Sequence, residues 1–288
     1  MRQALVFGAS GQIGRLLVRR LAGHGWQVLA VSRQARPDIE GVRWLRADLD
    51  AMDGWPPRVD ALLSCGPLDL FARWYAQARL ECPRVIAFGS TSVRVKAASA
   101  DADERALAAR LAAGERGVLE TASSRGAAAT VLRPTLIYGA GGDRTLTRIA
   151  ALARRWHRFV LPRDAVGLRQ PVHAEDLAAA AFAAIDAVVA HGRAYDLPGG
   201  ESLPYREMVA RVLAALQPPA RLHVWPAWAF RALLASARAA GLAAGFGGAA
   251  LARMREDLAF DAMPAQRDFG YAPRPFRPTA AMFAPPAE

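Results

Sequence analysis

The sequence predicts an α/β protein with a doubly wound parallel sheet and a smaller, mostly helical lobe in its C-terminal half. Short apolar runs alternate with helical patterns through the first half of the chain, which is the rhythm of βαβ crossovers. These runs are continuously apolar, as in strands of a sheet that helices cover on both faces. A glycine-rich turn follows the first run. Together these observations predict a parallel sheet between layers of helices.

The individual elements follow from the same rhythm. Each strand is a short apolar run, and each helix is a longer stretch between two such runs. The expected strands cover residues 4–7, 28–31, 42–45, 61–63, 85–88 and 130–132, and the expected helices cover 14–21, 71–80 and 104–123. After Pro134 the segments become rich in Ala, Arg and Pro and carry fewer strand signals. We expect that half to supply the end of the sheet and the smaller lobe.

Composition excludes several classes of protein. The 288 residues carry a formal net charge of +11, but the positive charge is nearly all arginine and is scattered, so we expect no nucleic-acid partner. Cys65 and Cys82 are too few for a disulfide framework, which favours a reducing cytoplasm. The apolar segment 239–251 is shorter than the roughly 20 residues of a transmembrane helix, so we expect a buried helix or one lying on a surface. We expect no metal site.

The first apolar run leads into a phosphate-binding turn. Three glycines with the spacing Gly8-x-x-Gly11-x-x-Gly14 lie between a predicted strand and a predicted helix. Glycines at such positions allow a tight turn and close approach of the backbone to a pyrophosphate, which the helix N-terminus then binds. The turn therefore predicts a dinucleotide cofactor. The candidate contacts in it are Gly8, Ser10, Gly11, Gln12, Ile13 and Gly14.

The end of the second strand indicates which dinucleotide is bound. An NAD enzyme usually has an acidic residue there to bind the ribose hydroxyls. This chain has Ser32 and Arg33 instead. A guanidinium pairs with a 2′-phosphate, and a serine hydroxyl adds a further contact. NADP(H) is therefore favoured over NAD(H), although Arg33 could also be an ordinary exposed arginine.

Several motifs in order resemble the extended short-chain dehydrogenase/reductases, the family of NAD(P)-dependent epimerases and dehydratases. They follow the glycine turn and continue almost to the end of the chain. The matching segments are Asp48-Leu49, Phe88-Gly89-Ser90-Thr91-Ser92-Val93, 132–139, 169–177, Tyr195-Asp196-Leu197 with Gly199-Gly200, and 269–276. The resemblance implies a Rossmann-type fold. It also implies an NAD(P)-binding domain over 1–170 and, over 171–288, remaining sheet elements interleaved with a small substrate-binding lobe.

The resemblance assigns further cofactor contacts. Asp48, with Leu49 beside it, is expected to contact the adenine. Cys65 and Gly66 follow the fourth strand and are expected near the cofactor, although Cys65 could be only a buried thiol. Pro134 belongs to the segment beneath the nicotinamide in the family pattern.

The family's catalytic pair is missing. Relatives use a Tyr and a Lys four residues later on the helix after the serine strand, but here that helix has neither, and Lys96 is the only lysine. The family spacing places the missing Tyr somewhere in 112–115, where Glu115 is expected to be an exposed glutamate. Ser90, or Thr91 in its place, is the remaining candidate on the strand end. Tyr138 is a spare hydroxyl near the nicotinamide segment, or simply a packing residue.

Three functions follow from this pattern. The first is an NADP(H)-dependent oxidoreductase acting on a small carbonyl or alcohol without the usual Tyr. The second is a regulatory or assembly protein that binds NADP(H) without turnover. The third is a nucleotide-sugar epimerase or dehydratase, as in many relatives. His173 is expected to be structural. Trp225, Trp228 and Phe230 suit either core packing or an apolar ligand, and the resemblance implies a homodimer as the candidate assembly.

Overall fold

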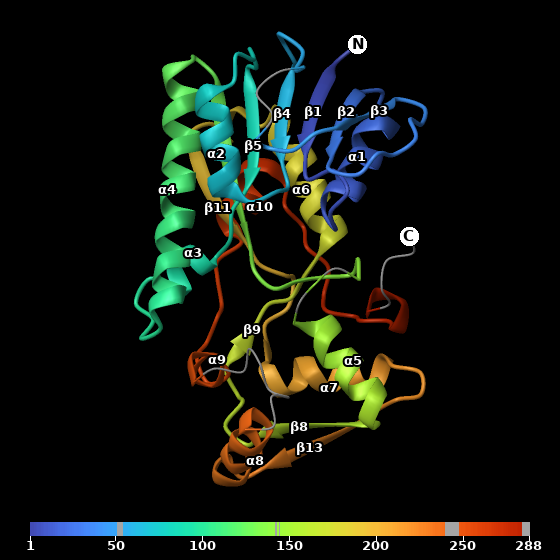
Figure 1. Cartoon of the computed structure of the whole chain (residues 1–288), viewed down its shortest axis with the longest axis vertical. Helices are drawn as coiled ribbons and strands as arrows, with labels where there is room; N and C mark the ends of the chain where they lie inside the picture. The colour runs from blue at the N-terminus through green and yellow to red at the C-terminus, as the bar shows by residue number, and fades with distance from the viewer. Residues whose placement is uncertain (51–53, 142, 144, 240–247, 284–288) are drawn as a thin grey trace. The chain divides into compact units, whose positions relative to one another are not determined.

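The computed structural model describes residues 1–50, 54–141, 143, 145–239 and 248–283, and the chain forms two compact units (Figure 1). Unit 1 comprises Met1–Thr135, Val172–Pro198 and Asp261–Pro273, and unit 2 comprises Leu136–Pro171, Gly199–Phe260 and Arg274–Glu288. The sequence predicts an NAD(P)-binding domain over 1–170, followed over 171–288 by remaining sheet elements interleaved with a small lobe. In the structure the chain already enters unit 2 at residues 136–171.

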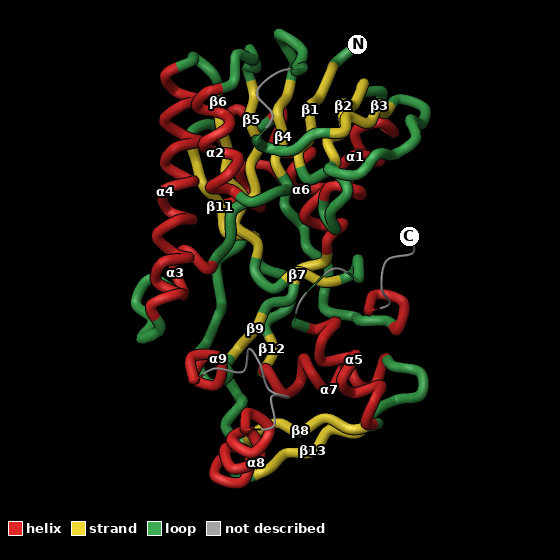
Figure 2. Tube along the Cα trace, viewed as in Figure 1, coloured by secondary structure: helices red, strands yellow, loops and turns green. Residues whose placement is uncertain are grey.

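Unit 1 contains a seven-stranded sheet, whose strands are among the yellow segments of Figure 2. All its strand pairs are parallel. Its order is β11-β6-β5-β4-β1-β2-β3. The strands are β1 (Gln3–Phe7), β2 (Gln27–Ser32), β3 (Val42–Arg46), β4 (Ala61–Ser64), β5 (Arg84–Phe88), β6 (Ala128–Pro134) and β11 (Arg193–Leu197). The chain builds outward from β1 in one direction through β2 and β3, and in the other from β4 to β11. This is the doubly wound fold that the apolar runs predict.

Two helix pairs flank this sheet. Their members are α1 (Gly14–Gly23) with α6 (Ala174–Asp186), and α2 (Leu68–Gln77) with α4 (Ala102–Ser124). The remaining elements of unit 1 are α3 (Ser92–Val95), β10 (Val172–His173), η1 (Val188–Ala190) and α10 (Met263–Phe269). A core that includes Phe7, Phe71 and Trp74 fills the space beneath α2 and α4. Burial of this apolar surface holds the helices to the sheet.

Unit 2 combines helices with short strands. Its elements are β7 (Ile137–Tyr138), α5 (Leu146–Trp156), β8 (Arg158–Pro162), β9 (Leu168–Arg169), β12 (Leu203–Pro204), α7 (Tyr205–Ala215), β13 (Arg221–Trp225), α8 (Ala227–Ala239), α9 (Gly248–Arg253) and η2 (Ala280–Phe283). Strand β8 pairs with β13, and β9 pairs with β12. Residues such as Leu146, Met208 and Phe276 form its core.

No helix in the described ranges is long and apolar enough to cross a bilayer. The apolar segment 239–251, expected as a buried helix or one lying on a surface, falls mostly outside the described residues.

Candidate functional site

The glycine turn lies where the strand order reverses. Strand β1 has β2 on one side and β4 on the other, and the chain winds away from it in both directions. Ligands of open α/β sheets bind at the carboxyl ends of the strands at such a point. Gly8 directly follows β1, and Cys65 and Gly66 directly follow β4. The sheet therefore brings the two predicted cofactor segments to one place.

Contacts within the turn explain two of its glycines. Gly8 has φ +67°, and a Cβ there would lie 2.7 Å from the carbonyl carbon of Cys65. A Cβ on Gly14 would lie 2.2 Å from the Gly8 oxygen. Side chains at either position would displace backbone atoms. The turn is closed by the Gly11 N–H, which donates to the Gly8 oxygen at 3.0 Å.

The start of α1 offers polar groups to a ligand. Ile13 occupies the N-cap without a side-chain cap, and the first turn of the helix carries no acidic residue. The N–H groups of Arg15 and Leu16 donate to the Gly11 and Ile13 oxygens at 3.0 and 3.1 Å, so an anion here would meet the N–H groups that precede Arg15, and the helix dipole favours an anion at this end. In the described part of the chain, the buried Oε1 of Gln12 has no hydrogen-bond partner. A glycine cradle, an uncapped helix and an orphaned amide oxygen fit a pyrophosphate-containing cofactor.

Ser32 ends β2 and Arg33 follows it, while Asp48 follows the neighbouring strand β3. Ser32 is buried, and its hydroxyl accepts from the Gln34 N–H at 3.2 Å. Arg33 is exposed. The Ala47 N–H donates to the Ser32 oxygen at 3.0 Å, which holds the segment before the exposed Asp48 beside the end of β2. These three candidates therefore share the edge that an adenosine would occupy.

Cys65 and Gly66 follow β4 and lie against the glycine turn. Burial raises the pKa of the Cys65 thiol to about 12, so the group is protonated at neutral pH. A protonated thiol is a poor nucleophile. A Cβ on Gly66 would lie 4.0 Å from a methyl carbon of Leu49, so this loop and the segment after β3 are close neighbours. The structure thus gathers the cofactor candidates of both segments.

The candidate serine and threonine follow β5. The Ser90 hydroxyl accepts from the Ser92 N–H at 3.1 Å and is half-buried. The buried Thr91 hydroxyl donates to the Pro134 oxygen at 3.2 Å, and its N–H donates to the same oxygen. Thr91 and Pro134 are therefore tied together, whereas the Ser90 hydroxyl donates to none of the residues that the structure describes.

A buried ion pair occupies the part of α4 that faces β5 and β6. Glu115 is only 4% exposed, which corrects the expectation of an exposed glutamate. Its carboxylate accepts from the Arg133 guanidinium in a bidentate pair, with 2.9 Å from Nε to Oε1. A Cβ on Gly89 would lie 3.0 Å from Glu115 Oε1, so a glycine leaves room for this carboxylate. The pair is a structural tie between helix and sheet.

Asp196 extends this ion pair to β11. It lies in register with Arg133, and their charged groups are 3.8 Å apart. Arg94 Nη1 is 2.9 Å from its other oxygen. Burial raises the pKa of Asp196, and the two guanidinium groups only partly offset that effect. Glu115 and Asp196 were missed as members of a site, although Glu115 falls on the inward, apolar face of α4 with Ala108, Val118 and Ala122.

Apart from Glu115, the inward face of α4 is apolar where the family has its Tyr and Lys. One and two turns before Glu115, the inward positions of α4 are Leu111, Leu107 and Ala108, which are buried or half-buried. None of these side chains carries a proton donor or acceptor. The only lysine, Lys96, precedes α4 and lies 3.5 Å from Glu104. Within the range 112–115, where the family spacing places the missing Tyr, the titratable group on this face is Glu115, and its carboxylate is bound by Arg133.

Tyr138 and His173 have packing roles. Tyr138 belongs to unit 2, is 1% exposed, and meets the Phe276 ring edge-on at 4.8 Å between centroids. His173 caps α6, with Nδ1 accepting from the Glu175 N–H at 3.2 Å, in keeping with its expected structural role. The described residues include no group of three or more metal-ligating side chains.

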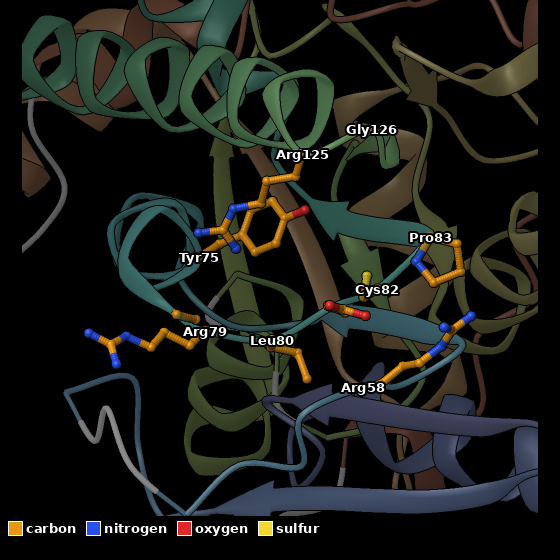
Figure 3. A pocket seen from close by; sticks show the side chains of 10 residues that line it. Arg58, Tyr75, Arg79, Leu80, Cys82, Pro83, Arg125 and Gly126 are labelled. Carbon is orange, nitrogen blue, oxygen red and sulfur yellow. The ribbon is translucent and has the colours of Figure 1, made fainter.

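A recess of about 550 Å³ lies at the opposite edge of unit 1 (Figure 3). Its lining comprises Arg58, Tyr75, Ala78, Arg79, Leu80, Glu81, Cys82, Pro83, Arg125 and Gly126. These residues surround the amino ends of β4 and β5, and Arg125 lies over the Tyr75 ring at 4.9 Å. Because α/β folds bind cofactors at the carboxyl edge, this recess is separate from the cofactor cradle.

Comparison with known proteins identifies relatives both by sequence and by fold. Over 254 aligned residues, the chain is 31% identical to a 2-alkyl-3-oxoalkanoate reductase of Stenotrophomonas maltophilia (strain K279a), covering 75% of this chain and 76% of that protein. Its fold resembles the epimerase Mth375 of Methanothermobacter thermautotrophicus, with a TM-score of 0.72, 15% identity, and 98% and 90% of the two chains covered. It also resembles UDP-glucuronic acid 4-epimerase of Bacillus cereus in complex with NAD, with a TM-score of 0.70, 13% identity, and 98% and 97% coverage.

The family model that matches is described as the NAD dependent epimerase/dehydratase family, and it covers residues 4–67 and 75–197. This range spans β1, the glycine turn and the sheet through β11. The resemblance that the motifs imply is thereby confirmed. The chain belongs to the NAD dependent epimerase/dehydratase family.

Proposed function

We propose that the protein is an NADP(H)-dependent oxidoreductase that reduces a carbonyl or oxidises an alcohol without the family's Tyr and Lys. The observation that carries this proposal is the cradle at Gly8, Gly11 and Gly14, combined with an inward face of α4 on which Glu115 is bound to Arg133 and the family's Tyr and Lys are missing. The first supports cofactor binding, and the second argues against the proton relay that most relatives use.

The cofactor would be held by both sides of the strand-order reversal. Backbone N–H groups at the start of α1 would bind the pyrophosphate, and Gly8 and Gly14 leave space for it. Ser32 and Arg33 would bind a 2′-phosphate, because an arginine donates to a phosphate but cannot accept from ribose hydroxyls. Asp48, Leu49, Cys65, Gly66 and Pro134 would line the rest of the site.

The bound nicotinamide supplies or accepts the hydride. Ser90 is then the group of this chain best suited to orient the substrate oxygen and donate or accept its hydrogen bond. Its hydroxyl accepts one bond from Ser92 and retains its proton for a ligand. Thr91 is less suited, because its proton is already donated to Pro134. Because this chain lacks the catalytic tyrosine of its relatives, proton transfer would rely on Ser90 and water. We therefore expect turnover to be slow.

The substrate class is guided by the reductase relative. That relative is named for a 3-oxo acid with alkyl substituents. We propose a ketone or secondary alcohol of comparable apolar character as the substrate, and not a nucleotide sugar. Epimerisation and dehydration of sugars also need a proton relay at the reacting carbon, and the acidic group on the inward face of α4, Glu115, is bound to Arg133.

A second candidate function is NADP(H) sensing without turnover. The specific observation in its favour is that Glu115, the one acidic side chain on the inward face of α4, is committed to Arg133. Such a protein would change its stability or its partner with the cofactor and perform no chemistry.

One experiment separates these functions. The purified chain is incubated with NADPH or NADP⁺ and a panel of 3-oxo acids, ketones, secondary alcohols and nucleotide sugars. The oxidation state of the cofactor is followed by the absorbance of the reduced nicotinamide. We expect slow turnover with ketones or alcohols. Ser90→Ala should lower kcat by about 100-fold or more, the lower end of general acid–base contributions. Ser92→Ala is the matched control and should not.

Two outcomes would contradict the proposal that the chain is an oxidoreductase. If NADPH raises the thermal midpoint but no compound in the panel is turned over, sensing is favoured. If neither nucleotide binds, both functions are overturned.

A further inference from the structure

Asp196 is a buried carboxyl in unit 1 that the proposed reaction does not use. It precedes the last residue of β11, its side chain is 7% exposed, and it lies in register with Arg133 on β6. Pro134, the next residue of β6, accepts the N–H of Thr91 in the segment that carries the candidate serine. Asp196 therefore lies one residue before the carboxyl edge of the sheet, close to this segment.

Charged groups from three elements face this carboxyl. They are Arg94 on α3, Arg133 on β6 and Glu115 on α4. Glu115 accepts from Nε and Nη2 of Arg133, and the remaining Nη1 lies 3.8 Å from Asp196 Oδ1, which is too far for a hydrogen bond. By contrast, Arg94 Nη1 lies 2.9 Å from Asp196 Oδ2. Among the three groups, Arg94 is therefore the close ion-pair partner of Asp196.

Helix α3 depends on anchors of this kind. It has four residues and no buried side chain, and a helix this short is not stable on its own. Its first residue, Ser92, donates its N–H to the Ser90 hydroxyl at 3.1 Å. Its third residue, Arg94, reaches Asp196 on β11, and Lys96 just after the helix forms an ion pair with α4. The place of the Ser92 N–H, and with it the orientation of the Ser90 hydroxyl, therefore depends on these anchors.

We propose that Asp196 is a positioning residue for Ser90, acting through Arg94 and α3. The Ser92 N–H occupies one lone pair of the Ser90 hydroxyl, which directs its proton and its other lone pair toward a ligand. Burial raises the pKa of the Asp196 carboxyl, so its charge, and with it the anchor, is lost at a higher pH than for an ordinary aspartate. This inference rests on the proposed role of Ser90 in the oxidoreductase reaction.

The kinetics of Asp196→Asn give the first test. The variant should lower kcat by about tenfold or more and leave KM and NADPH affinity unchanged, because a misplacement of about 1 Å at a reacting group can cost about 100-fold in rate. The kcat of the wild type should fall as the pH is lowered through the pKa of Asp196, and the kcat of the variant should not. A fall that the variant retains unchanged belongs to another carboxyl, such as Glu115, and counts against Asp196.

Variants of Arg94 test the same anchor without changing a buried group, since the Arg94 side chain is 60% exposed. Arg94→Gln should reproduce the loss of kcat, and Arg94→Lys, which keeps a cation, should restore part of it. Combining Arg94→Gln with Asp196→Asn should be no worse than Asp196→Asn alone, because both remove one contact. The matched control is Asp186→Asn, which breaks an exposed ion pair with Arg2 in the same unit and should change neither kcat nor its pH profile.

Amide hydrogen exchange tests the anchor without turnover. Asp196→Asn and Arg94→Gln should raise the exchange rates of the α3 amides severalfold, Ser92 above all, while the amides of α4 and β6 keep their wild-type rates. Wild-type exchange in α3 overturns the inference, as does faster exchange in α3 with an unchanged kcat, or an equal loss of kcat in Asp186→Asn. A wild-type chain that turns over no compound overturns the proposed oxidoreductase, and the exchange rates still decide whether Asp196 positions α3.

Discussion

The glycine turn and the α4–β6 region both lie at the carboxyl ends of strands in unit 1, but their polar groups differ in how they are partnered. The turn leaves backbone and amide groups open, whereas the α4–β6 region mainly pairs charged side chains with one another. The turn leaves an uncapped helix start and an orphaned Gln12 oxygen, and its glycines remove the side chains that would fill the space. In the other region, Glu115 is bound to Arg133, and Arg94 lies 2.9 Å from one oxygen of Asp196, whose buried Oδ1 has no hydrogen-bond partner among the described residues.

This difference separates binding from catalysis. A region with unsatisfied polar groups is prepared for a ligand, because an empty polar site carries a cost that the ligand removes. A region whose charged groups are mostly paired with one another mainly holds the fold, and here one oxygen of Asp196 is left without a hydrogen bond. The family's usual chemistry needs both a cofactor site and the Tyr and Lys of the helix after the serine strand. This chain keeps the glycine turn but lacks that Tyr and Lys.

Glu115→Gln should give the largest effect, because it breaks the more strongly closed region. Removing one partner of a buried ion pair typically costs about 3–5 kcal/mol. Asp196 remains 3.8 Å from Arg133, so we expect a loss near the low end, about 3 kcal/mol of unfolding free energy in urea.

The matched control is Glu120→Gln, since Glu120 is an exposed residue of the same helix. That change should alter stability by less than about 0.5 kcal/mol. Equal losses for the two variants would show that the ion pair does not tie α4 to the sheet.

Gly14→Ala should have a smaller effect on stability and a large one on the cofactor. The added Cβ would lie 2.2 Å from the Gly8 oxygen and 2.8 Å from the Ala9 Cα, so backbone atoms must move. Overpacking of this kind costs typically about 1–3 kcal/mol. Because the displaced atoms form the cradle, nucleotide affinity measured by calorimetry should fall further than stability alone requires.

Gly23→Ala serves as its control. Gly23 ends the same helix, and a Cβ there would meet no atom within 4 Å. It should keep both stability and affinity. A Gly14→Ala protein that binds nucleotide like the wild type would remove the argument that this glycine makes the cradle.

The sheet is predictable from the sequence because buried strands are local apolar runs. The strand expected over 4–7 is Gln3–Phe7, and that expected over 85–88 is Arg84–Phe88. The helix expected over 71–80 is Leu68–Gln77, three residues earlier at each end, because Pro67 forms its N-cap and Ala78 is already extended. The glycine turn was predictable as well, because its glycine spacing is also a local pattern in the sequence.

The ion-pair network was not predictable from motifs alone. Arg133 and Glu115 are 18 residues apart, and the distance between Asp196 and Arg133 depends on the pairing of β11 with β6. Helical spacing does place Glu115 with Ala108 and Val118 on an inward face, so its burial could have been inferred from periodicity. Its partner could not, because that depends on where a strand lies in the sheet.

Arg33→Asp tests the finest feature of the binding region, the choice between two dinucleotides. The side chain is exposed at the end of β2, so its removal should not affect folding. Losing a guanidinium–phosphate contact and adding a carboxylate should weaken NADPH affinity by about tenfold or more, whereas the carboxylate can accept from ribose hydroxyls and should spare or improve NADH. Titration of both nucleotides measures the ratio.

The control is Arg43→Asp, because Arg43 is an exposed arginine of β3 that lies before the carboxyl end of its strand. It makes the same change in net charge without placing a carboxylate beside the adenosine edge. A general electrostatic effect would lower NADPH affinity in both variants alike. A specific one would change the NADPH-to-NADH ratio only for Arg33→Asp, and an unchanged ratio there would mean that another group selects the nucleotide.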